Sequence, residues 1–231
     1  MSLLDDSRKE PRLRLAHGAE KELLFGGIPW LGALFAAILW PGILTILIAL
    51  VLTLLFAVLL YFFRDPPRVP PADADAIVAP ADGKVIQVER VDAAPFLNGP
   101  ALKISIFMSL FDVHVNRAPV AGRVALIEHV PGQFLQAFRP AASEVNEHNL
   151  IGLESAHGNV LVKQVAGVLA RRVVCWVRPA QVLQAGERLG VIKFGSRVDL
   201  FLPSGAEPAI KAGAHTRAGE TVVARWKVGS W

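Results

Sequence analysis

The chain has little of the chemistry that defines several common classes of protein. Cys175 is the only cysteine among 231 residues, so no internal disulfide can form, which fits a catalytic domain in the cytosol. No cluster of histidine, cysteine, aspartate and glutamate has metal-site spacing, and there is no glycine-rich phosphate loop. Basic residues do not alternate with aromatic ones as they do in nucleic-acid-binding proteins. We therefore expect neither a bound metal ion nor a nucleic-acid partner.

Charge is absent from one long segment. Between Phe25 and Phe63 there is no charged residue. Gly42–Phe63 is long enough to cross a bilayer as a helix, and Gly26–Trp40 is long enough for a tightly fitted second span or a re-entrant segment. Pro41 lies between them at a natural turn. The pattern predicts a helical hairpin in the membrane, and the alternative is a pair of buried core helices.

Positive charge lies on both sides of this apolar segment and predicts its orientation. Basic residues mark the cytoplasmic ends of membrane spans, so both flanks favour the same side, and two passes satisfy that where one does not. We therefore expect a cell-membrane protein with its catalytic domain on the cytoplasmic side. The flanking residues are Arg8, Lys9, Arg12, Arg14 and Lys21 before the segment, and Arg64 and Arg68 after it.

The distribution of residue types along the chain predicts its domain organisation. A basic leader (1–24) precedes the membrane hairpin (25–63), and a proline-rich linker (64–72) follows it. Residues 73–231 read as short β-branched runs separated by glycine, proline and aspartate, which are strand signals. The prediction is a mainly β catalytic domain, a small barrel or sandwich. Hairpin turns are expected at Asp82-Gly83 and at His157-Gly158, and a short helix at 133–138.

The pair Gly195-Ser196 lies between two strand-like runs and has a chemical reading. Glycine lets a hydroxyl approach the preceding carbonyl with no side chain in the way. If Ser196 attacks the carbonyl of Gly195, the amide becomes an ester, and elimination then cuts the chain and leaves a pyruvoyl group. Such a carbonyl is an electron sink for decarboxylation, a task that a bound cofactor performs in other enzymes. The alternative is an ordinary Gly-Ser turn.

Polar residues gather in three other places. Asp82 lies at a tight turn, where aspartate often caps the backbone. The segment from Asp112 to Pro119 holds His114, which can move protons near neutral pH, together with Asn116 and Arg117. If this segment is a strand, Asp112, His114 and Asn116 share one face. The Arg117 guanidinium is suited to a phosphate or a carboxylate. His129 lies in a polar loop sequence.

Taken together, these segments resemble the short-form phosphatidylserine decarboxylase proenzymes. The resemblance covers roughly residues 60–204. It rests on the Arg64-Asp65-Pro66 junction and on the segments around Asp82, His114, His129, Ser143 to Glu147, and Gly195-Ser196. That family is membrane-associated and depends on a pyruvoyl group made by self-cleavage. The resemblance implies that the chain is cut between residues 195 and 196 into two subunits, and that Ser196 becomes the covalent pyruvoyl cofactor.

The resemblance also implies roles for individual residues. Gly195, Ser196, His114 and Asp82 would be catalytic, in processing or in decarboxylation. Independently of the resemblance, Arg117, Asn116 and His129 are our candidates for binding substrate. One departure matters, because long-form relatives have a second histidine where this chain has Arg117. Their Asp-His-Ser processing triad therefore cannot be transferred whole, and His114 and His129 are the candidates for deprotonating Ser196.

The expected function is decarboxylation of phosphatidylserine, a membrane phospholipid, to phosphatidylethanolamine. Two alternatives stay open at this point. One is a pyruvoyl-dependent decarboxylase of another amine, such as a different phospholipid or a soluble amino acid. The other is a membrane-tethered β-barrel that binds a partner without catalysis. The sequence does not decide whether the protein forms homo-oligomers.

Overall fold

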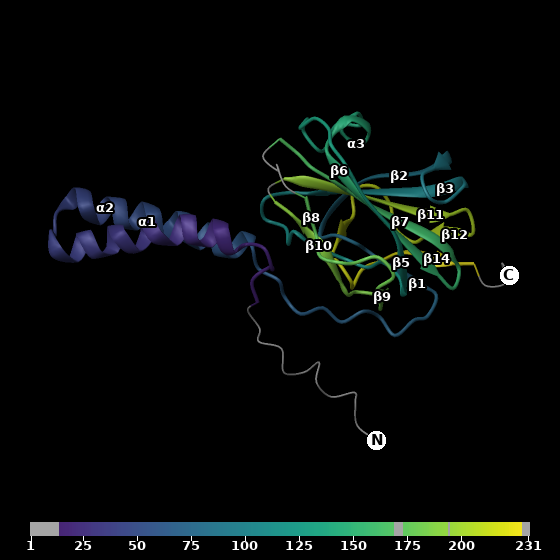
Figure 1. Ribbon diagram of the computed structural model, residues 1–231, viewed down its shortest axis with the longest axis horizontal. Coiled ribbons are helices and arrows are strands. Elements are labelled where there is room, and N and C mark those ends of the chain that lie inside the picture. The colour runs from purple at the N-terminus through teal and green to yellow at the C-terminus, as the bar shows by residue number, and fades with distance from the viewer. Residues whose placement is uncertain (1–13, 169–172, 194, 228–231) are drawn as a thin grey trace, which may run out of the picture. The chain divides into compact units, whose positions relative to one another are not determined.

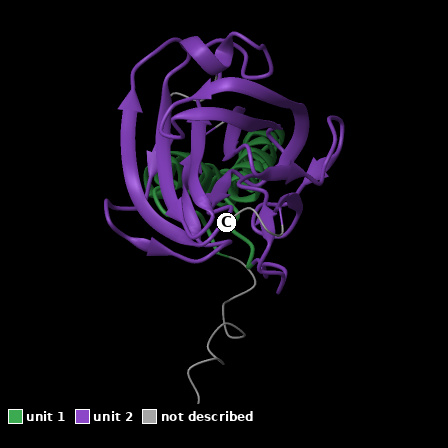
Figure 2. Ribbon diagram, turned by 90° about the vertical axis from the view of Figure 1, so that its right-hand side faces the viewer, with its two compact units in different colours: residues 1–67 green, residues 68–231 purple. Residues whose placement is uncertain are grey.

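The computed structural model describes residues 14–168, 173–193 and 195–227 (Figure 1). The chain divides into two units, residues 1–67 and 68–231, which differ in architecture (Figure 2). The first unit contains two helices, and the second contains all the strands and one short helix. A mainly β domain preceded by two apolar helices is the predicted fold class, which the structure confirms.

Two helices of equal length make up the first unit. Helix α1 (Glu20–Leu39) and helix α2 (Ile43–Phe62) are joined by a short turn at residues 40–42, as predicted. They pack along each other, where Trp30 stacks on Phe56 at a centroid distance of 4.6 Å and donates a hydrogen bond to Thr53 Oγ1 (3.0 Å). Both helices are long and apolar enough to cross a bilayer.

The second unit is built on one curled eight-stranded sheet with two small sheets beside it. The large sheet has the order β13-β2-β3-β11-β7-β6-β5-β9, and the small ones have the orders β1-β14-β12 and β4-β10-β8. Figure 2 shows the strands of this unit curving around an enclosed interior. The strands are β1 (Ala76–Val78), β2 (Gly83–Ala94), β3 (Gly99–Met108), β4 (Val115–Arg117), β5 (Gly122–Val130), β6 (His148–Ser155), β7 (Gly158–Val165), β8 (Val173–Cys175), β9 (Val182–Leu183), β10 (Arg188–Ile192), β11 (Ser196–Pro203), β12 (Ala206–Pro208), β13 (His215–Thr216) and β14 (Val222–Trp226).

Strand alternation decides which side chains enter the core. In β11, Val198 and Leu200 join the main apolar core, whereas Phe201 packs in a smaller cluster on the outer face. Residues from the two small sheets, such as Ile77, Leu189 and Val223, complete the same main core. Ser196 shares the parity of Val198, so the sheet directs its side chain into the interior.

Two of the three local predictions are wrong. Asp82-Gly83 is not a hairpin turn, because β1 pairs with β14 rather than β2, so the residues form a corner between two sheets. The short helix, α3, lies at Ala142–Val145 and not at 133–138, where Gln133 instead bridges to Asn146. His157-Gly158 does belong to the hairpin between β6 and β7.

The start of the second unit is tied to its body by an ion-pair cluster. Arg68 donates hydrogen bonds to Asp82 Oδ2 at 2.7 Å and to Glu220 Oε2 at 3.0 Å. Its side chain is largely buried, and so is that of Asp82. The linker residues from 68 onward therefore belong to the β unit. This cluster also uses up much of the hydrogen-bonding capacity of Asp82.

Candidate functional site

Ser196 begins the strand at the centre of the large sheet. β11 pairs with β3 along its whole length and with β7 from Arg197 to Phe201, and Ser196 lies opposite Met108. Gly195 has a φ of +57°, a backbone conformation that glycine adopts without the cost a side chain would bring. The Gly-Ser pair therefore forms the corner at which the chain turns into the sheet, and Ser196 itself is fully buried.

The serine hydroxyl has a weak hydrogen-bond partner. Ser196 Oγ donates to Met108 Sδ at 3.3 Å, and Asn116 Nδ2 contacts the same sulfur at 3.6 Å. A thioether is a poor acceptor, so both donors give up little when a stronger acceptor forms nearby. Asn116 Oδ1 in turn accepts a hydrogen bond from Gln164 Nε2 (2.7 Å), and all three polar side chains are fully buried.

His114 lies in the same corner of the fold as Ser196. Val115 pairs with Val191, and Ile192 N donates to His114 O (3.3 Å). Met108 pairs with Ser196, so the two ends of the segment 108–115 lie beside β11 and β10. His114 is buried, and its Nδ1 lies 3.0 Å from the carbonyl oxygen of Asp112. That contact fixes the ring in one orientation.

The structure does not place Asp112, His114 and Asn116 on one strand face. β4 is short and begins only at Val115, while Asp112 closes a turn by accepting hydrogen bonds from the backbone and hydroxyl of Ser109 (both 2.7 Å). The reason is the change of sheet within this segment, which a strand reading of the sequence could not detect. Asn116 still reaches Ser196, through Met108.

Asp82 lies two strands from Ser196 in the register. β2 and β11 flank β3, and the neighbouring residues Lys84 and Arg197 both pair with Phe107. Two strand spacings correspond to about 10 Å. Both carboxylate oxygens are engaged, since Ala218 N donates to Oδ1 (2.7 Å) and Arg68 to Oδ2. Burial nevertheless raises the pKa of Asp82, because desolvation outweighs these two partners.

Arg117 is buried and its guanidinium is used inside the protein. Its Nη1 donates to the carbonyl of Gly186 (2.9 Å), and its stem packs close to Gly219. Gly186 and Gly219 belong to two turns of matched sequence, each reading Ala-Gly-Glu, which lie close to Pro70 and Arg68. A role for Arg117 in binding substrate stays a prediction.

His129 lies on β5, three strands away from β11 across the sheet. It is exposed, and its Nδ1 is 2.8 Å from Asn149 Oδ1 on β6. The fold therefore brings His114, and not His129, to the corner that holds Ser196. Binding of substrate by His129 likewise stays a prediction.

A buried charged network lies on the opposite face of the same strand. Arg197 Nε donates to Asp199 Oδ1 (2.6 Å), Arg197 Nη2 donates to Ser105 Oγ (2.8 Å), and Ser143 Oγ donates to Asp199 Oδ2 (2.5 Å). Sequence reasoning did not assign roles to these residues. The parity of β11 could have revealed two charged residues on one buried face, but their partners come from segments distant in sequence.

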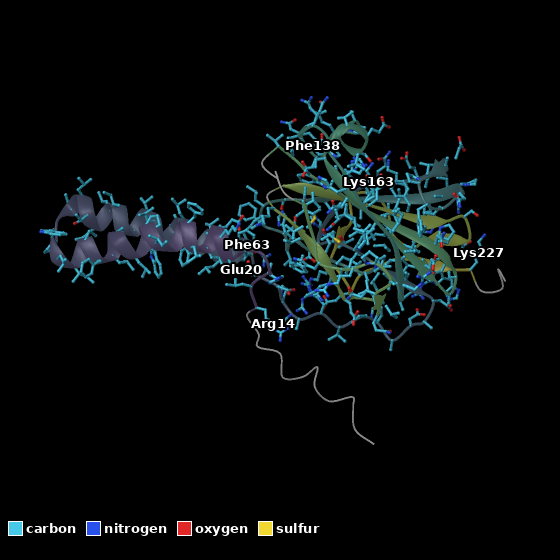
Figure 3. The ribbon with its side chains drawn as sticks, viewed as in Figure 1. Arg14, Glu20, Phe63, Phe138, Lys163 and Lys227 are labelled. Atoms are coloured by element: carbon cyan, nitrogen blue, oxygen red, sulfur yellow. The ribbon has the colours of Figure 1, made fainter. Side chains whose placement is uncertain are left out.

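An open apolar pocket of about 130 Å³ lies against Gly195. Its walls are Phe107, Leu110, Gln136, Ala137, Phe138 and Val168. Phe138 is edge-on to Phe107 and is half exposed, and Figure 3 shows it near α3 at the edge of the domain. Gly195 is thus approached through an apolar opening, which suits a ligand with apolar parts.

Burial shifts three other titratable groups near this sheet. Desolvation lowers the pKa of His148 and that of Lys163, which Figure 3 labels on β7, and it raises the pKa of the Cys175 thiol. Cys175 lies in β8 as predicted, although only partly buried. Its raised pKa makes it a poor nucleophile. Among the residues that the structure describes, no cluster of acidic, histidine or cysteine side chains is arranged to hold a metal ion.

Comparisons with known proteins agree on one family. The phosphatidylserine decarboxylase family profile matches residues 55–224. A phosphatidylserine decarboxylase proenzyme of Prosthecochloris aestuarii is 50% identical over 195 residues, which cover 84% of this chain and 89% of that protein. Proenzymes of the same name from Desulfotalea psychrophila and Carboxydothermus hydrogenoformans are 45% and 43% identical, over 85% and 95% of this chain and 93% and 99% of theirs. The chain belongs to the phosphatidylserine decarboxylase family.

Proposed function

We propose that this protein decarboxylates phosphatidylserine to phosphatidylethanolamine, using a pyruvoyl group that it makes by cutting itself between Gly195 and Ser196. The observation that carries the proposal is the corner at these two residues. A buried serine follows a glycine of positive φ there, and an open apolar pocket lies against the glycine. Relatives named as proenzymes of this decarboxylase support it.

The cut needs only groups of the chain and one water molecule. Ser196 Oγ attacks the carbonyl carbon of Gly195, the C–N bond breaks, and the hydroxyl proton passes to the released amine. Loss of the Cα proton of Ser196 then breaks the Cβ–O bond, and Gly195 leaves as a carboxylate. The dehydroalanine that remains transfers a proton from its nitrogen to Cβ and becomes an imine, and water hydrolyses this imine to the pyruvoyl ketone and ammonia. Every atom of the serine is accounted for.

His114 is the base that we propose for the first step. Of the two candidate histidines, it is the one whose segment pairs with Val191 at one end and with Ser196 at the other. Its imidazole is held by the carbonyl of Asp112, so it need not be reoriented before it takes a proton. The same group is placed to return a proton during decarboxylation. Asp82, with both oxygens engaged, would act on this site through its charge.

The surroundings of Ser196 fit a pyruvoyl group. The group is small and planar, and it would occupy a buried position fixed by the pairing of β11. Asn116 Nδ2 is an amide donor nearby, and its acceptor among the described residues is the sulfur of Met108. When present, the pyruvoyl carbonyl supplies an electron sink for the charge released by loss of carbon dioxide. Asn116 would orient its oxygen, and the apolar walls would limit access of water.

The substrate class follows from the apolar features of the chain. An enzyme meets a phospholipid at the surface of a bilayer, and two helices of this chain are suited to hold the protein there. We propose a cell-membrane location with both chain ends and the β unit in the cytoplasm, because basic residues flank both sides of the helices.

Tag accessibility tests this orientation. Tags at residues 1 and 231 should both resist labelling from outside intact spheroplasts. Opposite accessibilities would mean a single span.

Chain cleavage is the experiment that tests the proposal. The purified wild-type protein should run on a denaturing gel as two fragments, with the small one beginning at Ser196 and blocked to Edman sequencing by its ketone. Ser196→Ala should stay whole and inactive, while Ser204→Ala, an exposed serine just after β11, should be cut and active. An active protein that remains one uncut chain would overturn the proposal.

Substrate assays separate the remaining alternatives. Release of carbon dioxide from phosphatidylserine vesicles, but not from free serine, is expected. If only another amine-bearing phospholipid is turned over, the proposed chemistry stands and the proposed substrate is wrong.

The variant Arg117→Lys tests whether Arg117 binds substrate. An unchanged KM for the lipid in this variant would show that Arg117 is not part of the substrate site.

A further inference from the structure

Gly167 lies directly against the carbonyl that the proposed cut would attack. A Cβ atom built on Gly167 would lie 2.0 Å from the carbonyl oxygen of Gly195 and 3.1 Å from its carbon. Real side chains do not approach this closely, so the contact exists only because residue 167 has no side chain. Gly167 itself is buried. The φ of Gly167 is not positive, so its backbone conformation does not require glycine. The close approach of the Gly195 carbonyl is what leaves no room for a side chain at this position.

The position of Gly167 is held by one asparagine. Asn146 Nδ2 donates to the carbonyls of Ala166 and Leu135 (both 2.8 Å), and Asn146 Oδ1 accepts from Leu135 N (2.9 Å). Asn146 is fully buried. It thereby joins the residue before Gly167 to the segment that carries Ala137, whose Cβ is 3.4 Å from the same built atom.

The segment is also anchored to β11 itself. Ser143, in α3, donates to Asp199, and Asp199 is paired with Arg197, the residue after Ser196. The two anchors therefore join the segment 135–146 to the residue before Gly167 and to β11. We refer to Gly167, with Ala137 beside it, as the carbonyl notch.

We propose that the carbonyl notch is a positioning device for self-cleavage, in which Gly167, held by Asn146, orients the carbonyl of Gly195 toward the hydroxyl of Ser196. The inference rests on the proposed function, because it concerns the cut that produces the pyruvoyl group. A carbonyl must present its carbon to the attacking oxygen along a defined direction, and a misplacement of about 1 Å costs about 100-fold in rate. The notch restricts the oxygen so that the carbon stays accessible.

The notch has a different importance after the cut. Gly195 then becomes a chain end, and its carboxylate is no longer bonded to Ser196. A change at Gly167 should therefore slow cleavage far more than it slows turnover by molecules already cut. A residue that merely supports the fold would lower both.

Gly167→Ala tests the notch, with Gly122→Ala as its control. An alanine at 122 also meets a backbone carbonyl, that of Glu154 at 2.7 Å, but on the β5–β6 pair away from the cut. Cleavage is followed in time by denaturing gel and intact mass. We expect Gly167→Ala to be cut about 100-fold more slowly than wild type. The Gly167→Ala molecules that have been cut should show the wild-type kcat and KM. Gly122→Ala should be cut at the wild-type rate.

If Gly167→Ala does not fold, Asn146→Asp tests the role of the carbonyl notch instead. The carboxylate keeps the acceptor for Leu135 N but loses the donor to the two carbonyls, and it adds no atom to the notch. Asn159→Asp is its control, since Asn159 also donates to a backbone carbonyl, that of Phe96 (3.1 Å), at the far end of β7. Slow cleavage in Asn146→Asp alone supports the proposal.

Three results would count against these ideas in distinguishable ways. Wild-type protein that is never cut removes the proposed function and the notch together. Cleavage of wild type, Gly167→Ala and Asn146→Asp at one rate removes only the notch. Equal losses in cleavage rate and in turnover of the cut molecules would make Gly167 a residue of the fold and not a positioning residue.

Discussion

Asn116 and Gln164 form a buried amide pair whose energetics can be measured separately from catalysis. Gln164 Nε2 donates to Asn116 Oδ1, and within the described residues Gln164 Oε1 accepts no hydrogen bond. Removing one partner leaves a buried polar group unpaired, which costs about 1–3 kcal/mol, whereas replacing both with apolar groups is nearly neutral. The pair is therefore retained for something other than stability, and its contact with Met108 beside Ser196 indicates the site.

A double-mutant cycle tests this account. In an uncut Ser196→Ala background, Asn116→Leu and Gln164→Leu should each lower the free energy of unfolding by about 1–3 kcal/mol, and the double variant should lose less than the sum. With Ser196 restored, all three variants should lose activity, because Asn116 is then absent or misoriented. Additive stability losses with unaltered activity would show that the pair does not act as a unit and has no role in the site.

His148 gives the protein a predictable response to acid. It is buried on β6 with Nδ1 2.7 Å from the carbonyl of Asn146, and burial lowers its pKa from the ordinary 6.5. The unfolded chain therefore binds a proton more readily than the folded one as pH falls below 6.5. Stability from neutral His148 is present above pH 6.5 and is lost as pH falls toward the lowered pKa.

Thermal unfolding from pH 8 to pH 5 checks this response. His148→Gln keeps a side-chain donor but does not titrate, so the wild type should lose more stability than the variant over this range. A difference of 1 kcal/mol would move Tm by about 2–4 °C in a chain of this size. Parallel curves for the two proteins would mean that other groups determine the acid response.

Single residues also show what the sequence could and could not reveal. Ser196 and His114 could be proposed as site residues from the sequence, because their neighbours in the chain carry the pattern. Gly167 was not, because its importance comes from a carbonyl 28 positions away in sequence. Asn146 and Ser143 lie in a polar segment that also reads as solvated surface, and only the fold turns both of them inward.

At the scale of elements, the linker and the two matched turns form one assembly. The turns at Gly186 and Gly219 approach Pro70 and Arg68, and Arg68 joins Asp82 to Glu220. Strand runs with β-branched residues were readable from the sequence, whereas β4, β9 and β13 are too short for periodicity to show. The partner of β1 could not be inferred, because β14 lies at the opposite end of the chain.

Arg68→Met should weaken this assembly in a pH-dependent way. Removing one partner from a largely buried ion pair costs about 3 kcal/mol, because the remaining charge is left unpaired. The pKa of Asp82 is already raised by burial, and loss of the guanidinium would raise it further. Protonation then relieves the defect, so the loss of stability should be large at pH 8 and smaller near pH 4.

Denaturant unfolding at the two pH values measures this effect. Arg225→Met is the control, because Arg225 pairs with Asp73 at an exposed site, where loss of an ion pair should change stability little at either pH. An Arg68→Met defect that is equal at pH 8 and pH 4 would show that Asp82 is not the group left unpaired.

For the whole molecule, the proposed cut would divide the chain without dividing the fold. The fragment from Ser196 onward supplies β11, which lies between β3 and β7 in the large sheet, and β13, which pairs with β2. It also supplies β12 and β14, and β14 pairs with β1. Four pairings, β11–β3, β11–β7, β13–β2 and β14–β1, thus cross from one fragment to the other, and Arg197 and Asp199 add a buried network to them.

The two fragments should therefore stay together after cleavage and separate only when the protein unfolds. A C-terminal tag on the small fragment should retain the large fragment through washes in high salt, because β ladders and apolar core contacts are not screened by ions. Release should coincide with loss of secondary structure in a denaturant titration. Asp199→Leu, which leaves Arg197 buried without its acid, should lower the denaturant midpoint for release and for unfolding together. Exchange of the small fragment between intact, folded molecules would show that the strands of the two fragments are not one cooperative unit.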